Sequence, residues 1–511
     1  MAILAAGVGF SIRGGILKLW AEEYGFTMTD LGEITGGGLT GGGIIILVGA
    51  FVADKVGYGK LMALAFVMHF VSVILTLAAD AAFAAGGKDA AFQCLYWGMF
   101  LFAVGNGICE AVVNPLVATA FPTNKTHYLN ILHAGWPGGL ILGGLVSYFM
   151  NPDDGKAVPW EIQMSLFMIP VVLYGLMVLG QRFPRSEASQ AGVSYGEMFS
   201  QLFAPVMIML LLIHALVGYV ELGTDSWISK ITGAIMESKQ KGLLLFVYTS
   251  GLMFALRFFA GPIVEKISPL GLLFVSGLLG FAGLQLLGSA TTVTLCIVAA
   301  TVYACGKTFL WPTMLGVASE RFPKGGAITI GAIGGMGMLS AGLLGGPGIG
   351  FKQDYYASGQ LKAESPAIYE RYKSDEENHF LTFNVVGLDG AKVGVLDDGG
   401  KELSRANEIL QKEAKTDKNT SKLVTWWGDA SQYAHTIDEL KKIKQHELKE
   451  DPSKDNQAVR EAGLYGGRMA MKYTSFVPLA MAGLYLLLIL YFKTQGGYRQ
   501  VHVVQAGADL A

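Results

Sequence analysis

Apolar stretches long enough to cross a lipid bilayer recur along almost the whole chain. A helix that spans the hydrocarbon core needs about 20 mostly apolar residues, and we find twelve such stretches among the 511 residues. Their recurrence excludes a soluble globule and a disordered chain, and it predicts an all-α membrane protein with twelve transmembrane helices. The stretches lie at residues 1–21, 33–54, 61–79, 92–118, 128–150, 161–181, 201–223, 242–263, 269–288, 292–316, 327–350 and 473–493.

Charged residues gather in one segment near the C-terminus. They make up 15% of the chain, whereas soluble domains contain roughly 25%. Residues 351–472 hold 40 of the 78 Asp, Glu, Lys and Arg residues. We therefore expect a small α+β insert between the eleventh and twelfth helices. Apolar alternation predicts a β-hairpin over 381–396, and helices are expected over 402–415 and 436–448.

The loops between the stretches predict the orientation of the chain. Short loops on the cytoplasmic side of a membrane carry an excess of Lys and Arg. Lys55, Lys125 and Arg182 fall on one side, whereas Glu22 and Asp80 fall on the other. This bias predicts a multi-pass protein of the cytoplasmic (inner) membrane with both termini in the cytoplasm, which places the insert outside.

A polar segment divides the stretches into two sets of six. Six plus six spans with a central loop is typical of a two-bundle secondary transporter. The expected units are an N-terminal six-helix bundle at 1–181, a cytoplasmic linker at 182–200, the seventh to eleventh helices of a C-terminal bundle at 201–350, the extracytoplasmic insert at 351–472, and the twelfth helix with a cytoplasmic tail at 473–511.

Ionisable residues inside the stretches are the candidates for function, because a charge at membrane depth is costly. Glu110 lies well inside the fourth stretch, where a carboxyl group can bind and release a proton; the alternative is a structural ion pair with Arg13. Arg13 and Lys307, one in each half, can neutralise Glu110 or hold an anionic solute. Arg257 lies nearer the inner end of its stretch and is interpreted as structural.

Residues 50–60, after the second stretch, carry the first family resemblance. They are similar to the Gly-x-Leu-Ala-Asp-Arg-x-Gly-Arg-Arg motif of the major facilitator superfamily, with Asp54 and Gly57 matching and Lys55 conservative. Arg257 resembles a reduced form of this motif in the second half. The resemblance implies gating or structural roles for Asp54, Lys55, Gly57, Lys60 and Arg257.

A narrower resemblance rests on the fourth and fifth stretches. Glu110 followed by Asn114-Pro115, and then Leu129-Asn130, is similar to the fucose/glucose/galactose–proton symporter group. That group carries Glu-x-x-x-Asn-Pro on its fourth span and Leu-Asn on its fifth. The resemblance implies proton coupling through Glu110. Arg13 stands where the group has an acidic residue on its first span.

These patterns favour a secondary active transporter that moves a sugar or a related small polar solute together with a proton. Aromatic and hydrogen-bonding side chains typically hold such solutes, although packing is the commoner role of a buried Trp. The predicted substrate-binding residues are Arg13, Asn114, Asn130, His133, Trp136, Gln285, Lys307 and Trp311.

Two alternatives remain open. An organic-anion transporter would use Arg13 and Lys307, and a membrane receptor or assembly protein would act through the insert.

An enzyme is not expected, because no catalytic cluster or phosphate loop can be assembled from the spans. The net charge of −2 predicts no nucleic-acid partner. We expect no cofactor and no metal site, and a monomer whose partners are the solute, H+ and membrane lipid.

Overall fold

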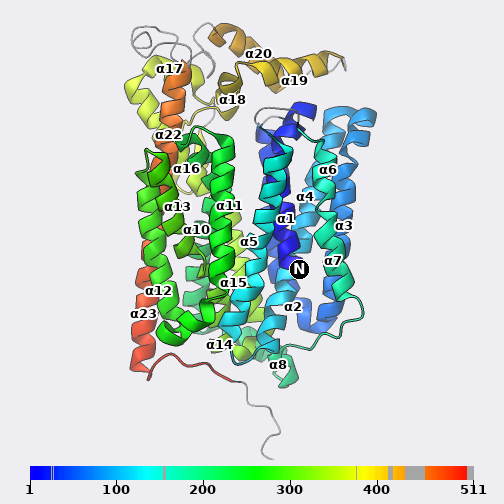
Figure 1. Ribbon diagram of the computed structural model, residues 1–511, viewed down its shortest axis with the longest axis vertical. Helices are drawn as coiled ribbons and strands as arrows, with labels where there is room; N and C mark the ends of the chain where they lie inside the picture. Colours follow the sequence, from blue (N-terminus) through cyan, green and yellow to red (C-terminus); the bar gives the residue numbers. More distant parts are fainter. Residues whose placement is uncertain are drawn as a thin grey trace, which may run out of the picture.

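Helices account for most of the chain that the structure describes. The computed structural model describes residues 1–24, 26, 28–152, 157–375, 377–412, 418–431 and 455–502. Its long helices run roughly parallel in two groups, and the insert lies at one end (Figure 1). We call that end the insert side, and the opposite end, where α8 lies, the linker side.

The first half of the chain forms one of the two groups. α1 packs on α5, and α4 packs on both α2 and α3. Gly87, with φ of +69°, bends α4 near its start. The helices are α1 (Ala2–Tyr24), α2 (Met28–Val56), α3 (Tyr58–Leu77), α4 (Ala79–Ala120), α5 (Lys125–Met150), α6 (Trp160–Ser165) and α7 (Met168–Val178). A link with α8 (Glu187–Gln190), α9 (Tyr195–Ser200) and the short η1 (Gln201–Phe203) follows.

The second half forms the other group. α12 packs on α13 and α23, and α10 packs on α11 and α15. Its elements are α10 (Pro205–Ile235), α11 (Lys239–Arg257), α12 (Ala260–Gly288), α13 (Val293–Lys307), α14 (Leu310–Arg321), η2 (Pro323–Gly325), α15 (Gly326–Ser340), the π-helical η3 (Ala341–Gly345), α16 (Gly346–Glu364), α22 (Asp455–Thr474) and α23 (Phe476–Thr494). α16 and α22 pack together and carry the insert.

The insert differs from the expected hairpin. It contains α17 (Pro366–Tyr372), β1 (Asn378–Phe380), β2 (Phe383–Val385), α18 (Gly390–Asp398), α19 (Lys401–Lys412) and α20 (Lys418–Ala430). β1 pairs with β2 in antiparallel register, but a hairpin over 381–396 is wrong because its second half is α18. The Asp389 side chain accepts hydrogen bonds from two backbone N–H groups and so caps this helix. The helix expected over 436–448 lies outside the described residues.

Ten helical stretches of the described residues are long and apolar enough to cross a membrane. The sequence predicted twelve. Of the two others, α1 contributes only the shorter apolar helix Ala2–Leu17, and α11 starts with Lys239-Gln240-Lys241. Large apolar side chains on the outside of both groups, such as Leu176 and Leu212, are more than 60% exposed. Such a surface suits lipid rather than water, so the chain is a multi-pass membrane protein.

Each group has its own buried apolar core. One core includes Ile12, Ala65 and Leu95, and the other includes Leu210 and Tyr303. Between the groups, α2 packs on α15, and α5 packs on α11 and α14. These contacts position the polar residues that lie between the two groups.

Gly139 brings α5 against the backbone of α1. A Cβ atom here would lie 2.2 Å from the Leu4 carbonyl oxygen, and backbone cannot move aside as a side chain can. Gly139→Ala is therefore expected to lower the free energy of unfolding by about 1–3 kcal/mol, measured by thermal unfolding of the purified protein. Gly251→Ala is the matched control, since nothing lies within 4 Å of its Cβ position. Equal losses for the two variants would contradict this account.

Candidate functional site

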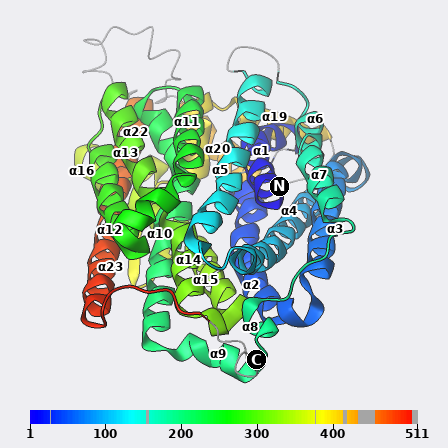
Figure 2. The ribbon, with the colours of Figure 1, turned by 60° about the horizontal axis from the view of Figure 1, so that its bottom comes forward.

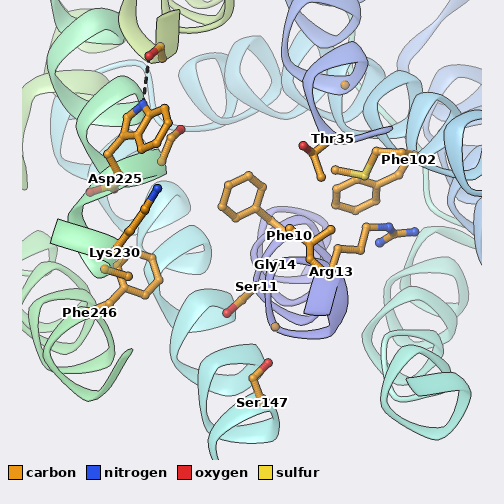
Figure 3. A pocket seen from close by; sticks show the side chains of 18 of the residues that line it. Phe10, Ser11, Arg13, Gly14, Thr35, Phe102, Ser147, Asp225, Lys230 and Phe246 are labelled. Atoms are coloured by element: carbon orange, nitrogen blue, oxygen red, sulfur yellow. Dashed lines mark hydrogen bonds between the residues drawn. The ribbon is translucent and has the colours of Figure 1, made fainter. Parts of the chain in front are cut away.

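A cavity of about 1770 Å³ lies between the two groups of helices. Residues of both halves surround it: Phe10 and Ser11 come from α1, whereas Asp225 and Phe246 come from α10 and α11 (Figure 3). On the insert side it reaches residues of the insert itself. Its lining includes the apolar side chains Phe10, Phe102, Trp136, Phe246 and Met338, the polar side chains Ser11, Thr35, Asn106, Glu110 and Ser147, and the insert residues Asn378, His379 and Arg405.

A polar stripe runs along α4 at the wall of this cavity. Asn106, Glu110 and Asn114 are four residues apart, so they share one face of the helix. The Asn114 side-chain amide donates to Glu110 Oε2 over 2.6 Å. Asn106 Oδ1 accepts from His69 Nε2 over 3.0 Å, and the Tyr174 hydroxyl donates to the other ring nitrogen of that histidine. Asn106 and Glu110 line the cavity.

His133 of α5 completes the surroundings of Glu110. Its Nε2 donates to Asn114 Oδ1 over 2.9 Å and lies 3.9 Å from Glu110 Oε2. The Glu110 side chain is 13% exposed and that of His133 is 4% exposed. Among the described residues, no Lys or Arg lies within ion-pair distance of Glu110. The structural ion pair with Arg13 is therefore not formed.

Arg13 lines the cavity but turns its guanidinium group toward the interior of the first half. The group lies 4.0 Å from the centre of the Phe102 ring and 5.1 Å from that of Phe167. It donates to Ser72 Oγ over 3.2 Å. Figure 3 shows Arg13 beside Phe102, on the side of α1 away from Asp225. Cation–π contacts of this kind stabilise a desolvated guanidinium.

Two buried ion pairs occupy the second half. Arg257 Nη2 lies 3.2 Å from Glu221 Oε1, and Lys307 Nζ binds Asp225 Oδ1. Arg257 also donates to the Thr308 carbonyl over 2.8 Å and to the His133 carbonyl. Arg257 therefore joins the second half to His133 of the first half, the residue beside Glu110. Because Lys307 is neutralised by Asp225, the expected pairing of Arg13 with Lys307 around an anion is not assembled.

Polar contacts close the linker side below the cavity. They join one face of α5 to α14, and Asn130 is fully buried among them. This interface includes hydrogen bonds from Lys125 Nζ to the Ser319 carbonyl (3.3 Å), from Thr126 Oγ1 to Glu320 Oε1 (2.6 Å) and from Asn130 Nδ2 to Thr313 Oγ1 (3.1 Å). We call these contacts the linker-side gate.

The motif at the end of α2 and the start of α3 contacts the link between the halves. Asp54 Oδ2 accepts from the Ser186 hydroxyl over 2.7 Å, and Lys55 Nζ lies 4.3 Å from the centre of the Tyr195 ring. Gly57 has φ of +92°, a conformation that favours glycine, at the turn into α3. Lys60 is exposed. The expected gating residues therefore lie on the linker side.

The structure separates the predicted substrate-binding residues into three sets. Arg13 and Trp136 line the cavity. Asn114, Asn130, His133, Lys307 and Trp311 are buried behind its wall, with Trp311 packed on the His214 ring. Gln285 donates to Ser475 Oγ over 2.8 Å, between α12 and the segment joining α22 to α23. Phe10, Asn106 and Phe246 also line the cavity, but they were not predicted from the sequence. Of the three, only Asn106 could have been predicted, because it lies four residues before Glu110.

Two helix groups around a cavity, with lipid-facing apolar surfaces, define a multi-pass membrane protein of the transporter type. The sequence profile of the Major Facilitator Superfamily matches residues 1–346, so the chain belongs to that family. No match was found among curated protein sequences.

Solved structures agree in fold at low identity. The transporter FucP, in the outward conformation, is 16% identical with a TM-score of 0.56, covering 69% of this chain and 90% of FucP. The proton:xylose symporter XylE bound to 6-bromo-6-deoxy-D-glucose is 13% identical with a TM-score of 0.58, covering 71% and 88%. A bacterial homologue of the human lysosomal transporter Spinster, inward-facing, is 13% identical with a TM-score of 0.61, covering 98% and 97%.

Proposed function

We propose that this protein is a secondary active transporter that moves a sugar or a related small polar solute together with a proton. The observation that carries the proposal is a carboxyl group, Glu110, in the wall of a central cavity, with an amide and an imidazole as its polar partners. Two structural neighbours are described as a fucose:proton and a proton:xylose symporter, which supports the proposed solute class.

The surroundings of Glu110 suit both of its protonation states. An ionised carboxylate accepts the hydrogen bond from the Asn114 amide. A protonated carboxyl group can instead donate to Asn114 Oδ1 once the amide rotates and His133 takes the tautomer whose Nε2 accepts, because an amide offers both a donor and an acceptor and a neutral imidazole has two tautomers. A Lys or Arg side chain at ion-pair distance would hold Glu110 ionised, but none of the described residues forms such a pair with it. We therefore assign proton coupling to Glu110, with Asn114 and His133 as its supports.

The proposed transport cycle starts from the conformation of this structure, in which the linker side of the cavity is closed. The linker-side gate is formed while the cavity reaches the insert. Transport requires the gate to separate while the insert side closes, by movement of two six-helix bundles. The first bundle comprises residues 1–181, and residues 201–350 and 473–493 form the second. This proposal includes twelve helices that cross the cytoplasmic membrane and an insert at 351–472 on its outer side. It also places the linker at 182–200 and both termini in the cytoplasm, and it takes the protein to be a monomer.

An organic anion is the second candidate solute. Arg13 is a buried cation whose Nε has no hydrogen-bond partner among the described residues. Its contact with Phe102 and Ser72 would have to loosen before the guanidinium group met a solute in the cavity. Arg13 and Glu110 both line the cavity, but this candidate depends on a movement of the Arg13 side chain.

A ligand screen tests the proposed solute class. Purified protein is heated with sugars, sugar acids and nucleosides at two pH values, and a solute that binds the folded state raises the unfolding temperature. A ligand at 100 times its Kd stabilises by about 2.7 kcal/mol. We expect neutral sugars to stabilise the protein and to be taken up by proteoliposomes under an inward proton gradient. Stabilisation by sugar acids alone would favour the anion candidate, and absence of uptake for every stabilising solute would overturn transport.

A further inference from the structure

The chain does not stop at α23 but folds back under the helices. Gly496 and Gly497 have φ of +84° and +101°, values that favour glycine, and they turn the chain after the helix ends. Residues 498–502 then run from α23 across the linker side (Figure 2). This course takes the C-terminal segment directly beneath the linker-side gate.

Most of this segment binds the second half. The Tyr498 hydroxyl donates to Glu320 Oε2 over 2.7 Å, and the Val501 N–H donates to the Glu320 carbonyl over 2.8 Å. Arg321 donates to the Arg499 carbonyl. Burial and the adjacent Glu320 carboxylate hold the pKa of Tyr498 well above its usual value.

Gln500, in the middle of the segment, binds the first half. The Gln500 side-chain amide donates to the carbonyl of Pro122, in the turn between α4 and α5. Glu320 provides a second connection between the segment and the first half. Its Oε1 accepts hydrogen bonds from the Thr126 N–H (3.2 Å) and hydroxyl (2.6 Å) of the first half, while its Oε2 accepts from Tyr498.

We propose that residues 498–501 form a C-terminal clasp that holds the linker-side gate closed, with Tyr498 and Gln500 as positioning residues for the transport cycle. Separation of α5 from α14 moves Pro122 and Thr126 away from Glu320, so it breaks the Gln500 bond together with those of the gate. Tyr498 fixes the Glu320 carboxylate in the orientation that Thr126 requires. The clasp rests on the proposed function only in requiring that the two halves move apart.

The test measures opening of the linker side directly, without solute or proton gradient. Nitroxide labels are attached at Val56 on α2 and Lys266 on α12, both exposed, in a background that lacks the four native cysteines. Pulsed electron paramagnetic resonance then gives the populations of short and long distances. Because a hydrogen bond contributes about 0.5–1.5 kcal/mol, removing one is expected to raise the open-to-closed ratio about two- to tenfold.

Tyr498→Phe and Gln500→Ala are each expected to raise that ratio, and the double variant to raise it further. Val501→Ala is the matched control, because it alters the same segment but keeps the backbone N–H that binds Glu320, so its ratio should equal that of the parent. Unchanged distances in the double variant, with an unchanged unfolding temperature, would overturn the clasp. Such a result would not contradict proton-coupled uptake. Conversely, if the distances change as expected but the protein shows no proton-coupled uptake, the clasp stands and only the proposed function fails.

Discussion

Glu110→Gln is expected to reduce proton-driven accumulation of the solute by roughly 100-fold or more, while exchange of solute across the membrane without a gradient persists. The amide has nearly the shape of the carboxyl group and still lines the cavity, so solute binding and movement of the two halves can continue. It cannot bind or release a proton, so a proton gradient no longer drives the cycle. The measurement compares uptake under a proton gradient with counterflow in the same proteoliposomes.

Glu161→Gln supplies the matched control for this experiment. Glu161 lines the same cavity, but it lies at the start of α6, toward the insert side. The same chemical change there should leave gradient-driven uptake close to that of the parent protein. Full retention of accumulation in Glu110→Gln would remove Glu110 from proton coupling. Loss of uptake in Arg13→Gln alone, with Glu110→Gln active, would favour an organic anion as the solute.

The polar stripe on α4 could be predicted from the sequence because helical spacing is a local property. Positions four residues apart share a face wherever the helix lies, so Glu110 and Asn114 belong together by sequence alone. Their partner on another helix could not be predicted in the same way. His133 and Arg13 are both polar residues in apolar stretches, and only the rotation of α5 and α1 about their axes decides which one meets Glu110.

The charges of the second half show the same limit more clearly. Lys307 and Asp225 are 82 residues apart in the chain, and Arg257 and Glu221 are 36 apart. The pattern of each stretch identified the cations as unusual, but it carried no information on which acid would neutralise each one. Lys307 was consequently expected to bind solute, whereas its ammonium group is bound by Asp225.

The insert shows that one short motif can begin two different structures. Asp389-Gly390 between apolar residues is typical of a hairpin turn, yet Asp is equally suited to the first position of a helix. Here the Asp389 carboxylate caps α18, and the strands that pair lie earlier, on either side of Leu381. The apolar stretches were predicted more reliably because their length alone distinguishes a span from a turn.

Arg257→Met is expected to lower the free energy of unfolding by about 3–5 kcal/mol, the usual cost of breaking a buried ion pair by removing one partner. Both side chains of the pair are nearly inaccessible, at 1% for Arg257 and 4% for Glu221. Glu221 Oε2 already lacks a hydrogen-bond partner among the described residues, and removing Arg257 takes away the one ion pair that those residues give this carboxylate. The measurement compares the unfolding temperature of the purified variant with that of the parent protein, and denaturant unfolding gives the difference in free energy.

The double variant Arg257→Met with Glu221→Met separates the ion pair from the packing around it. Replacing a buried ion pair by apolar residues of similar volume is often close to neutral, so most of the stability lost in the single variant should return. The stability that does not return measures the hydrogen bonds that Arg257 donates to the carbonyl groups of Thr308 and His133, because these bonds are lost in both variants. Because the His133 carbonyl belongs to the other half, that remainder also estimates how strongly Arg257 joins the halves. A double variant as unstable as the single one would show that these carbonyl contacts, rather than the charge of Glu221, dominate the role of Arg257.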